Sequence, residues 1–265
     1  MPENKHISFS EPLEALAPIS LEEMDGVKLM NRTDTKYLTD ESTLLRILAD
    51  AAAAGYRVLV TEDMRISPYD SVYYDTAGLR MFCDHHNRRL VRQKVRTRSY
   101  VNSGDTFLEI KRKNNKGRTK KKRLRIPPDE LMDFRADTVA CTYLAGHSWF
   151  SAPDLSPVLE TLFHRITLVN PALTERLTID TQLCFKNFRT GKGTTLQDAV
   201  IIELKQDGRA DSRMKNILLD LRVKPVRVSK YCIAVTLTDP QAKSGRFKEK
   251  VRYIEKTIGK KLVTI

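Results

Sequence analysis

The chain has 265 residues, a hydrophobic content of 41% and a formal net charge of +13, which allow a sizeable core and favour an anionic partner: nucleic acid, an anionic membrane surface or a phosphate-rich small molecule. Its four cysteines form no C-x-x-C pair, which argues against a zinc ribbon and against a disulfide framework. No stretch approaches the ~20 apolar residues of a membrane span, and the acidic, proline-containing start lacks the apolar core of a signal peptide, so we expect a soluble cytoplasmic protein without a membrane span.

The first predicted element is a short helix at 21–30, within a lead-in that covers residues 1–29. A strand at 31–39 follows, and Asp40 and Gly55 then suit the N-cap and the C′ position of a helix between them. The further predicted strands are 57–60, 66–76, 88–101, 106–113, 119–126, 164–170, 175–181, 199–206 and 226–231, and helical patterns cover about 129–145, 154–163, 210–221 and 241–258. Many strands with few helices favour a mainly β (α+β) fold, an antiparallel sheet or barrel with helices outside.

Basic residues recur on one face of these strands, because successive side chains of a strand point to opposite faces. The residues that share this face are Arg32, Asp34 and Lys36; Arg92, Lys94, Arg96 and Arg98; Glu109, Lys111 and Lys113; Arg123 and Arg125; Arg165 and Thr167; Arg176, Thr178 and Asp180; and Glu203 and Lys205. For any one strand, the ordinary interpretation is a half-buried sheet with its polar face in water. Taken together, the strands predict a cationic lumen if the sheet closes, and gathered like charges imply a polyanionic ligand.

Two acids on these faces precede a lysine by two residues: Glu109 before Lys111, and Glu203 before Lys205. A carboxylate repels phosphate unless a hard divalent cation lies between them, so one interpretation is Mg²⁺ or Mn²⁺ bound by Glu203, together with Glu109. An ion pair with the neighbouring lysine is the other interpretation. Glu203 is the stronger metal-ligand candidate because the opposite face of its strand is apolar.

Eight short motifs occur in a fixed order along the chain: TDTKYL, SVYYDT, KVRTRSY, FLEIKRK, TLFHRITLVN, ERLTIDT, VIIELKQ and RVSKY. Together they resemble the VTC domain of polyphosphate polymerases, a branch of the triphosphate tunnel metalloenzymes, which also include the CYTH phosphatases. The resemblance covers about residues 30–240. It implies a closed antiparallel eight-stranded β-barrel tunnel with a basic lumen. It also implies transfer of the γ-phosphate of ATP to a growing polyphosphate chain with Mn²⁺ or Mg²⁺. Residues 241–265 lie beyond the match, and we expect them to pack on the same domain as a C-terminal helix.

The resemblance also implies roles for individual residues. The positions that match phosphate-binding residues of the family are Lys36, Arg96, Arg98, Lys111, Arg165, Arg176, Lys205, Ser229 and Lys230, and Glu203 matches the metal-binding glutamate. Two positions depart from family patterns. The first strand reads Arg32-x-Asp34-x-Lys36 where the CYTH branch has E-x-E-x-K, which favours the VTC branch, and Phe163 occupies a position that is often Tyr.

The most basic stretch of the chain is 111–125, which by composition resembles a nuclear signal or a nucleic-acid patch. Alternation of its flanks instead predicts a hairpin that turns near 114–117, with Glu109 and Arg123 facing the lumen and the phosphates. Lys113, Lys116, Arg118 and Lys120 would then form a positive collar at the hairpin tip.

Three other functions stay open: triphosphate or polyphosphate hydrolysis, nucleic-acid binding, and polyphosphate sensing without catalysis. An aromatic content of only 7% and the lack of an RNA-recognition stacking motif argue against a specific nucleic-acid partner. The tunnel-facing positions contain no His, which fits a phosphate acceptor that needs no general base, and His85 and His86 are interpreted as surface residues in a turn. No pattern indicates the oligomeric state.

Overall fold

The computed structural model describes residues 8–24, 32–208 and 211–263, so two parts of the lead-in, 1–7 and 25–29, lie outside the described residues. The strands are β1 (Ala17–Ile19), β2 (Arg32–Asp40), β3 (Arg57–Leu59), β4 (Ser67–Asp75), β5 (Arg92–Tyr100), β6 (Asp105–Lys113), β7 (Thr119–Ile126), β8 (Ser156–Val169), β9 (Glu175–Asn187), β10 (Gly193–Leu196) and β11 (Ala199–Asp207). The helices are α1 (Ser10–Glu14), α2 (Leu21–Met24), α3 (Glu41–Ala53), α4 (Arg80–His86), α5 (Thr138–His147), α6 (Arg213–Asp220), α7 (Lys230–Thr238) and α8 (Lys248–Ile258), with short 3₁₀ turns at Pro128–Leu131, Ala152–Asp154 and Gly245–Phe247.

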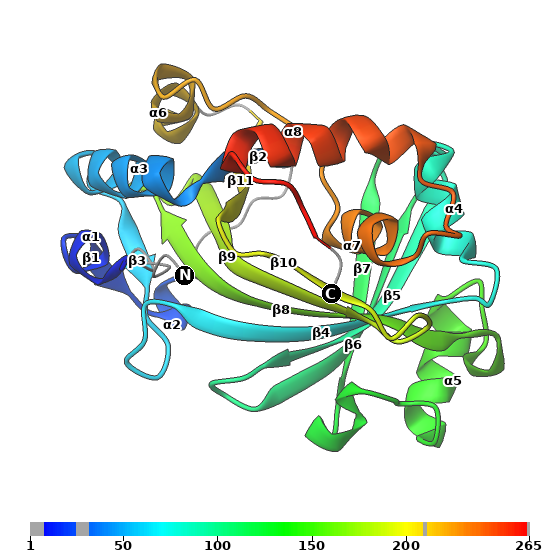
Figure 1. The fold of residues 1–265 in the computed structure, drawn as a ribbon. Coiled ribbons are helices and arrows are strands. Elements are labelled where there is room, and N and C mark those ends of the chain that lie inside the picture. The colour runs from blue at the N-terminus through cyan, green and yellow to red at the C-terminus, as the bar shows by residue number, and fades with distance from the viewer. Residues whose placement is uncertain (1–7, 25–31, 209–210, 264–265) are drawn as a thin grey trace.

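All the strands belong to one 11-stranded sheet, whose main path runs β2-β11-β9-β8-β4-β5-β6-β7. Neighbours on this path are antiparallel, and β6 and β7 form the predicted hairpin. The long strands β4 and β8 run through the middle of the molecule, and β5 and β7 cross them steeply because the sheet is strongly twisted (Figure 1).

The predicted closed eight-stranded barrel is wrong in two respects. The sheet contains three strands besides the eight of the main path, and within the described residues its end strands β2 and β7 do not pair with each other. Closure depends on strand tilt and stagger. Alternation reveals which face of a strand is charged, but it carries no information on whether two edges meet.

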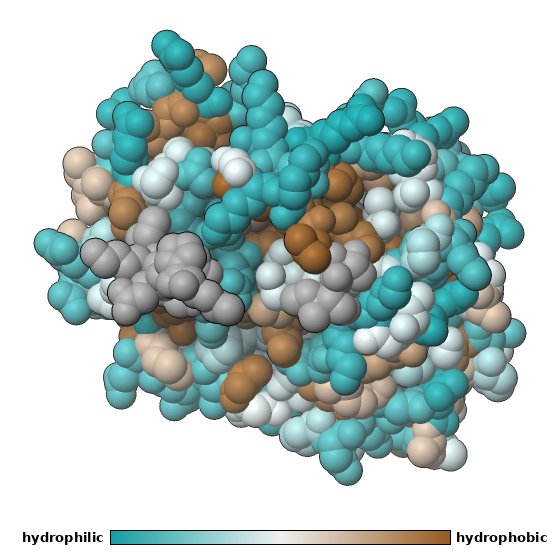
Figure 2. All heavy atoms as spheres, viewed as in Figure 1, coloured by the Kyte–Doolittle hydropathy of each residue, from teal (hydrophilic) through white to brown (hydrophobic). Residues whose placement is uncertain are grey.

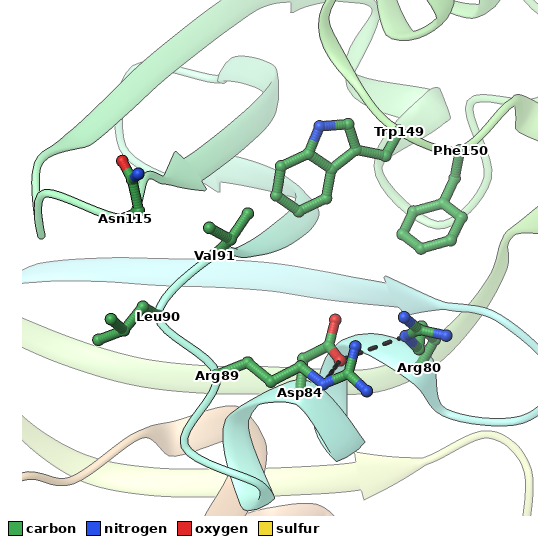
Figure 3. A pocket seen from close by; sticks show the side chains of 8 residues that line it. All are labelled: Arg80, Asp84, Arg89, Leu90, Val91, Asn115, Trp149 and Phe150. Carbon is green, nitrogen blue, oxygen red and sulfur yellow. Dashed lines mark hydrogen bonds and ion pairs between the residues drawn. The ribbon is translucent and has the colours of Figure 1, made fainter.

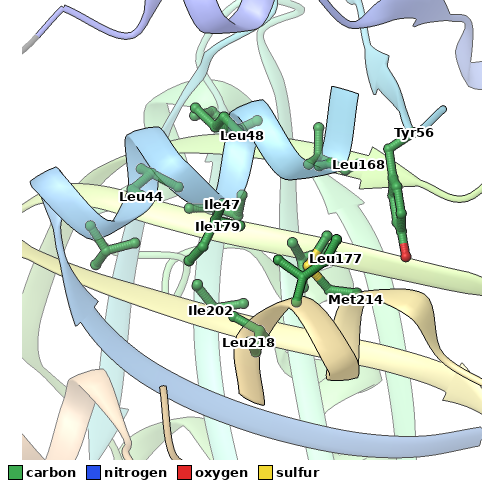
Figure 4. Close-up of a cluster of buried hydrophobic side chains, with 14 of the residues drawn as sticks. Leu44, Ile47, Leu48, Tyr56, Leu168, Leu177, Ile179, Ile202, Met214 and Leu218 are labelled. Carbon is green, nitrogen blue, oxygen red and sulfur yellow. The ribbon is translucent and has the colours of Figure 1, made fainter. Parts of the chain in front are cut away.

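Helix α3 forms where the sequence predicts it. The Asp40 side chain accepts a hydrogen bond from the Thr43 N–H at 2.8 Å, and Gly55 ends the segment at φ +76°. Figure 4 shows Leu44, Ile47 and Leu48 of α3 directed toward apolar side chains of the sheet, Leu177, Ile179 and Ile202 among them. Burying a side chain of this size contributes about 1.5–3 kcal/mol. The prediction that the uncharged strand face packs on helices is thus confirmed for α3.

Helix α5 covers the same face at the other end of the sheet. One buried cluster joins Ala140 and Leu144 of α5 to Val95, Leu108 and Ile110 of β5 and β6. The face opposite to these apolar residues carries the charges.

The prediction of a strand at 226–231 is wrong, because helix α7 begins at Lys230 and no strand directly precedes it. The chain from 224 to 229 is irregular, and Ser229 then caps α7 by accepting a hydrogen bond from the Cys232 N–H at 3.3 Å. The buried cluster around α7 contains Leu38, Phe163 and Ile201, which share the charged face of the sheet by alternation. The helix therefore fills one end of that face instead of lying outside, as a helix that is apolar all round must be buried.

Three further segments differ from prediction. Residues 156–163 belong to β8 and not to a helix. A register shift between Leu162 and His164 interrupts the alternation of this strand, so the sequence pattern did not indicate it. The pattern at 129–145 divides into a 3₁₀ turn and α5. The segment with His85 and His86 is helical, and His86 is buried and accepts a hydrogen bond from the Arg246 N–H at 3.2 Å, so its assignment to the surface is wrong.

Hydrophilic side chains cover most of the face shown in Figure 2, with hydrophobic ones in small separate groups. None of the described helices has the length and apolar character needed to cross a lipid bilayer.

Candidate active site

Strand register brings the predicted site residues onto one face of the sheet. Paired positions across neighbouring strands are Lys36 and Glu203, Lys205 and Arg176, Arg165 and Asp180, Arg98 and Ser71, Arg96 and Glu109, Lys94 and Lys111, and Lys111 and Lys121. We call this surface the cationic face. Lysines and arginines outnumber carboxylates on it, and Lys230 reaches it from the first turn of α7.

A buried network fixes Arg96 on β5. Its guanidinium donates two hydrogen bonds to Glu109 Oε2, at 2.7 and 2.5 Å, and a third to the Tyr73 hydroxyl at 3.0 Å, while Lys121 pairs with the other Glu109 oxygen. Burial alone would raise the pKa of Glu109, but Arg96, Arg98 and Lys121 outweigh burial and hold this pKa well below its usual range. Glu109 therefore stays ionised and orients Arg96.

A second network fixes Arg165 on β8. Arg165 donates two hydrogen bonds to the Asp180 carboxylate, at 2.6 and 2.9 Å, and Lys230 pairs with the same carboxylate at 2.7 Å. Burial would raise the pKa of Asp180, but Arg165 and Lys230 lower it below its usual range. The Lys230 ammonium also lies 3.0 Å from the centroid of the Phe163 ring. The phenylalanine ring therefore stabilises a cation here without the hydroxyl group that a tyrosine would add.

Glu203 is the carboxylate of a third network. It lies between Lys36 and Lys205, at 3.3 and 3.5 Å. Burial would raise the pKa of Glu203, but Lys36 and Lys205 lower it below its usual range. Burial lowers the pKa of Lys205 to about 8, an effect that Glu203 opposes and the nearby arginines reinforce.

Three cations on this face form no ion pair with a carboxylate in the described part of the chain: Lys94, Arg98 and Lys111. Arg98 is buried and donates one hydrogen bond, to Ser71 Oγ at 3.0 Å, and burial and then Arg96 lower its pKa. The charge of Arg96, followed by burial, holds the pKa of Lys111 well below its usual range. Lys94 donates a hydrogen bond to Ser229 Oγ at 2.9 Å, and burial lowers its pKa. Positive charges crowded together without counter-ions are costly, so a bound anion would stabilise this part of the face.

Comparison with known proteins identifies the family. The VTC domain family matches residues 31–238. This chain belongs to the VTC domain family. The resemblance inferred from the eight motifs is thereby confirmed.

Solved structures similar to this VTC domain are remote in sequence. A protein from Bacillus halodurans, described provisionally as an adenylate cyclase, is 11% identical over 83% of this chain and 100% of that chain, with a TM-score of 0.49. A Hippeastrum protein likewise described, and reported to have a dominant triphosphatase activity, is 13% identical over 77% and 94% of the chains, with a TM-score of 0.46. The protein PH1819 from Pyrococcus horikoshii is 13% identical over 76% and 97%, with a TM-score of 0.41. A search of curated proteins found no match.

The carboxylates of this VTC domain fit a divalent cation only together with a phosphate ligand. Among the described residues, no three His, Cys, Asp or Glu side chains come together as a metal site. Mg²⁺ and Mn²⁺ are bound in many phosphate sites by one or two carboxylates plus the phosphates themselves, and Glu203, ion-paired but partly exposed, suits that role. Both oxygens of Glu109 are already paired with cations, so Glu109 suits it less well.

Three further predicted residues, Arg123, Arg176 and Ser229, lie on or beside the cationic face of the VTC domain. Arg123 is exposed and stacks on Phe107 at 4.8 Å. Arg176 lies opposite Lys205 on β9. Ser229 binds Lys94 and caps α7 at the same time.

The prediction of site residues missed Lys94, Lys121, Asp180 and Tyr73. Alternation already placed Lys94 and Asp180 on the correct face, so charge pattern alone was a sufficient signal for them. Tyr73 carries no such signal because Tyr74, its neighbour on the opposite face, is also a tyrosine.

Proposed function

We propose that this VTC domain transfers the γ-phosphate of ATP to the end of a polyphosphate chain, with Mn²⁺ or Mg²⁺, in the cytoplasm. The observation that carries the proposal is the group formed by Lys94, Arg98 and Lys111, cations without carboxylate partners beside Arg96. A chain of phosphates supplies the negative charge that this group lacks. We also propose that residues 30–240 form the catalytic domain and that 241–265 pack on it, as Phe247 and Ile254 do in the buried cluster around α7.

The proposed site contains two kinds of cation: those that a carboxylate holds in place and those that have no carboxylate partner among the described residues. Arg96 and Arg165 are fixed by Glu109 and Asp180, so their remaining donors are oriented before the phosphates arrive. The proposed phosphate-binding residues are Lys36, Arg96, Arg98, Lys111, Arg165, Arg176, Lys205 and Lys230, with Arg123 and Ser229 at the margins. A divalent cation held by Glu203 and the phosphates, with Glu109 as the further candidate ligand, would neutralise charge on the transferred group.

The ionised state of the acidic side chains favours a phosphate acceptor over water. Glu109, Asp180 and Glu203 are each ion-paired with at least two cations, which stabilises their ionised forms and makes them weak bases. The terminal phosphate of a polyphosphate chain is already an anion and needs no base to activate it.

Hydrolysis of triphosphate or polyphosphate is the second candidate. The side chains of Lys36 and Lys121 are 39% and 38% exposed, so water reaches the cationic face from more than one side. Phosphoryl transfer to water would need only that a water molecule take the place of the acceptor phosphate.

Incubation with ATP and Mn²⁺, followed by gel separation of the products, separates these functions. Long polyphosphate supports the polymerase, inorganic phosphate alone supports the hydrolase, and tripolyphosphate binding without turnover indicates a sensor. The variant K111M should abolish turnover, whereas K122M, which removes a cation from the opposite face of the adjoining strand, should retain it. Full activity in K111M would contradict the assignment of the cationic face.

A further inference from the structure

A concave site lies outside the cationic face, where β5 begins and where β6 and α5 end. It is a groove with a volume of about 730 Å³, and Figure 3 shows Leu90 and Val91 on one side of it and Trp149 and Phe150 on another. Leu90, Val91 and Trp149 are 59%, 46% and 42% exposed. Large apolar side chains gathered in this way at a surface mark a site of contact with another molecule or with a membrane.

A buried glutamine holds the Trp149 side of the groove in place. Gln93 lies on the face of β5 opposite to Lys94. Its side-chain amide donates a hydrogen bond to Ser148 Oγ at 2.6 Å and accepts one from the backbone N–H of Trp149 at 3.1 Å. The Arg112 guanidinium lies 4.9 Å from the centroid of the indole ring. An exposed ring that is already fixed loses little conformational freedom when it binds.

The Leu90 side of the groove is fixed by the turn that follows α4. The Arg89 N–H donates a hydrogen bond to the Asp84 carbonyl at 3.0 Å, and the Arg92 guanidinium donates one to the Arg89 carbonyl at 2.6 Å. The turn that exposes Leu90 and Val91 is therefore tied to both α4 and β5.

Guanidinium groups form the polar side of the groove. Arg80 and Arg89 each pair with Asp84 through Nε, at 3.2 and 3.3 Å, and both arginine side chains are more than half exposed. Figure 3 shows this triad below the apolar side chains. The outer nitrogens of each guanidinium are further donors, suited to a phosphate group. An anion bound there would lie next to the apolar side chains.

Further basic residues extend this surface along the hairpin of β6 and β7. Arg112 lies opposite Lys120, and Lys122 lies opposite Ile110, which belongs to the buried cluster under α5. Both lysines are exposed. These basic side chains therefore lie on the α5 side of the hairpin, away from the cationic face, and attract an anionic surface.

The features of the groove correspond to the parts of an anionic phospholipid. Aliphatic tips contact acyl chains, an indole ring is typical of the level of the headgroups, and guanidinium groups bind the lipid phosphate. Apolar tips with basic side chains around them are the arrangement by which proteins lie on an anionic membrane.

We propose that this groove docks the protein on an anionic membrane. Leu90, Val91 and Trp149 enter the boundary between headgroups and acyl chains, and a lipid phosphate lies at Arg80 and Arg89. The proposal does not depend on the proposed function. Because the cationic face lies on the other side of β5, β6 and β7, it stays free for phosphates while the protein is docked.

Sedimentation of the intact protein with lipid vesicles tests the groove. The vesicles contain phosphatidylcholine alone, or equal parts of phosphatidylcholine and phosphatidylglycerol. The wild type should bind only the second kind, and the fluorescence of Trp149, the only tryptophan of the chain, should then shift to shorter wavelength. L90D should weaken binding about tenfold or more, since an apolar side chain no longer leaves water. K122M should weaken it about fivefold, as expected for one basic residue near an anionic surface.

Each variant has a control that makes the same change of charge elsewhere. F188D places an aspartate at another exposed apolar position. K111M removes one positive charge from the cationic face. Both controls should bind anionic vesicles as the wild type does. K111M should thus lose ATP turnover and keep vesicle binding, whereas K122M should keep turnover and lose part of the binding.

Three outcomes would overturn the proposal. Equal binding by the wild type and L90D, or equal losses in L90D and F188D, would mean that net charge alone holds the protein on the vesicles. Binding without a shift in the fluorescence of Trp149 would place the contact elsewhere. A wild type that binds neither kind of vesicle would leave an acidic protein segment as the occupant to test next. None of these results bears on the proposed function, which the gel assay tests.

Discussion

At the scale of single residues, Glu203 is the carboxylate whose removal distinguishes metal binding from ion pairing. In E203Q, metal-dependent ATP turnover should fall about 100-fold or more, as expected for loss of a carboxylate that binds the metal. Tripolyphosphate binding without metal should instead become tighter, because one negative charge leaves a phosphate site. The measurements are turnover with Mn²⁺ and calorimetry in a chelator.

The control for E203Q is D105N, which removes a carboxylate that pairs with Arg125, a side chain that is 73% exposed. It should change neither quantity. Weaker metal-free binding in E203Q would show that Glu203 serves chiefly to position Lys36 and Lys205.

Lys205 makes anion binding depend on pH. Because its pKa is about 8, Lys205 loses its proton between pH 7 and 9, and tripolyphosphate affinity should fall about tenfold over that range as one charge-assisted contact is lost. K205R stays charged and should flatten part of this dependence. Calorimetry at pH 7, 8 and 9 measures the effect, and identical pH profiles of K205R and the wild type would rule Lys205 out as its source.

The lowered pKa of Lys205 also affects the stability of the fold, which should rise with pH whereas the affinity for tripolyphosphate falls. Between pH 8 and 10.5 the unfolded chain holds the Lys205 proton more firmly than the folded protein does, so this residue makes the ligand-free protein more stable as pH rises. K205M should remove that contribution from a series of thermal unfolding curves.

At the scale of elements, α7 links folding to the cationic face through its N-cap. S229A removes the side-chain oxygen that accepts hydrogen bonds from the Cys232 N–H and from Lys94. The free energy of unfolding should fall by about 1 kcal/mol, and tripolyphosphate affinity should fall as well because Lys94 loses its orienting partner. Urea unfolding and calorimetry measure the two effects.

The matched control for S229A is D137A, which removes the cap of α5, where Asp137 accepts a hydrogen bond from the Val139 N–H at 2.7 Å. It should cost similar stability without changing affinity. Equal affinity losses in S229A and D137A would mean that the effect of Ser229 is only a general loss of stability.

Elements also show how far sequence reasoning reaches. Strands β5, β6 and β11 alternate regularly and could be predicted with their charged faces, and the Asp40 cap predicted the start of α3. The run after Ser229 is short and apolar, and such a run does not distinguish a strand from a buried helix.

The same limit applies to the site. Arg96 and Glu109 could be placed together by alternation. The contact of Lys230 with Asp180 depends instead on where the first turn of α7 packs against the sheet. That contact joins residues far apart in sequence, so no local pattern records it.

At the scale of the whole molecule, the net charge of +13 raises the question of which cations are paired with a carboxylate. Arg96 and Arg98 are two residues apart on β5, both buried and both on the cationic face, but within the described residues only Arg96 forms an ion pair with a carboxylate. Tripolyphosphate at 100 times its dissociation constant should stabilise the wild type by about 2.7 kcal/mol, which raises the melting temperature by roughly 5–10 °C.

The two variants at these positions should then behave oppositely. R96M leaves the buried Glu109 with Lys121 alone and should destabilise the ligand-free protein by about 3 kcal/mol, as expected when a buried ion pair is broken. R98M removes a cation that is held by Ser71 and aromatic rings and forms no ion pair in the described part of the chain, so the ligand-free melting temperature should stay the same or rise while the shift caused by tripolyphosphate shrinks. A loss of stability in R98M as large as that in R96M would mean that the fold itself compensates Arg98, and an anion would then no longer be needed to explain why so many cations share one face of the sheet.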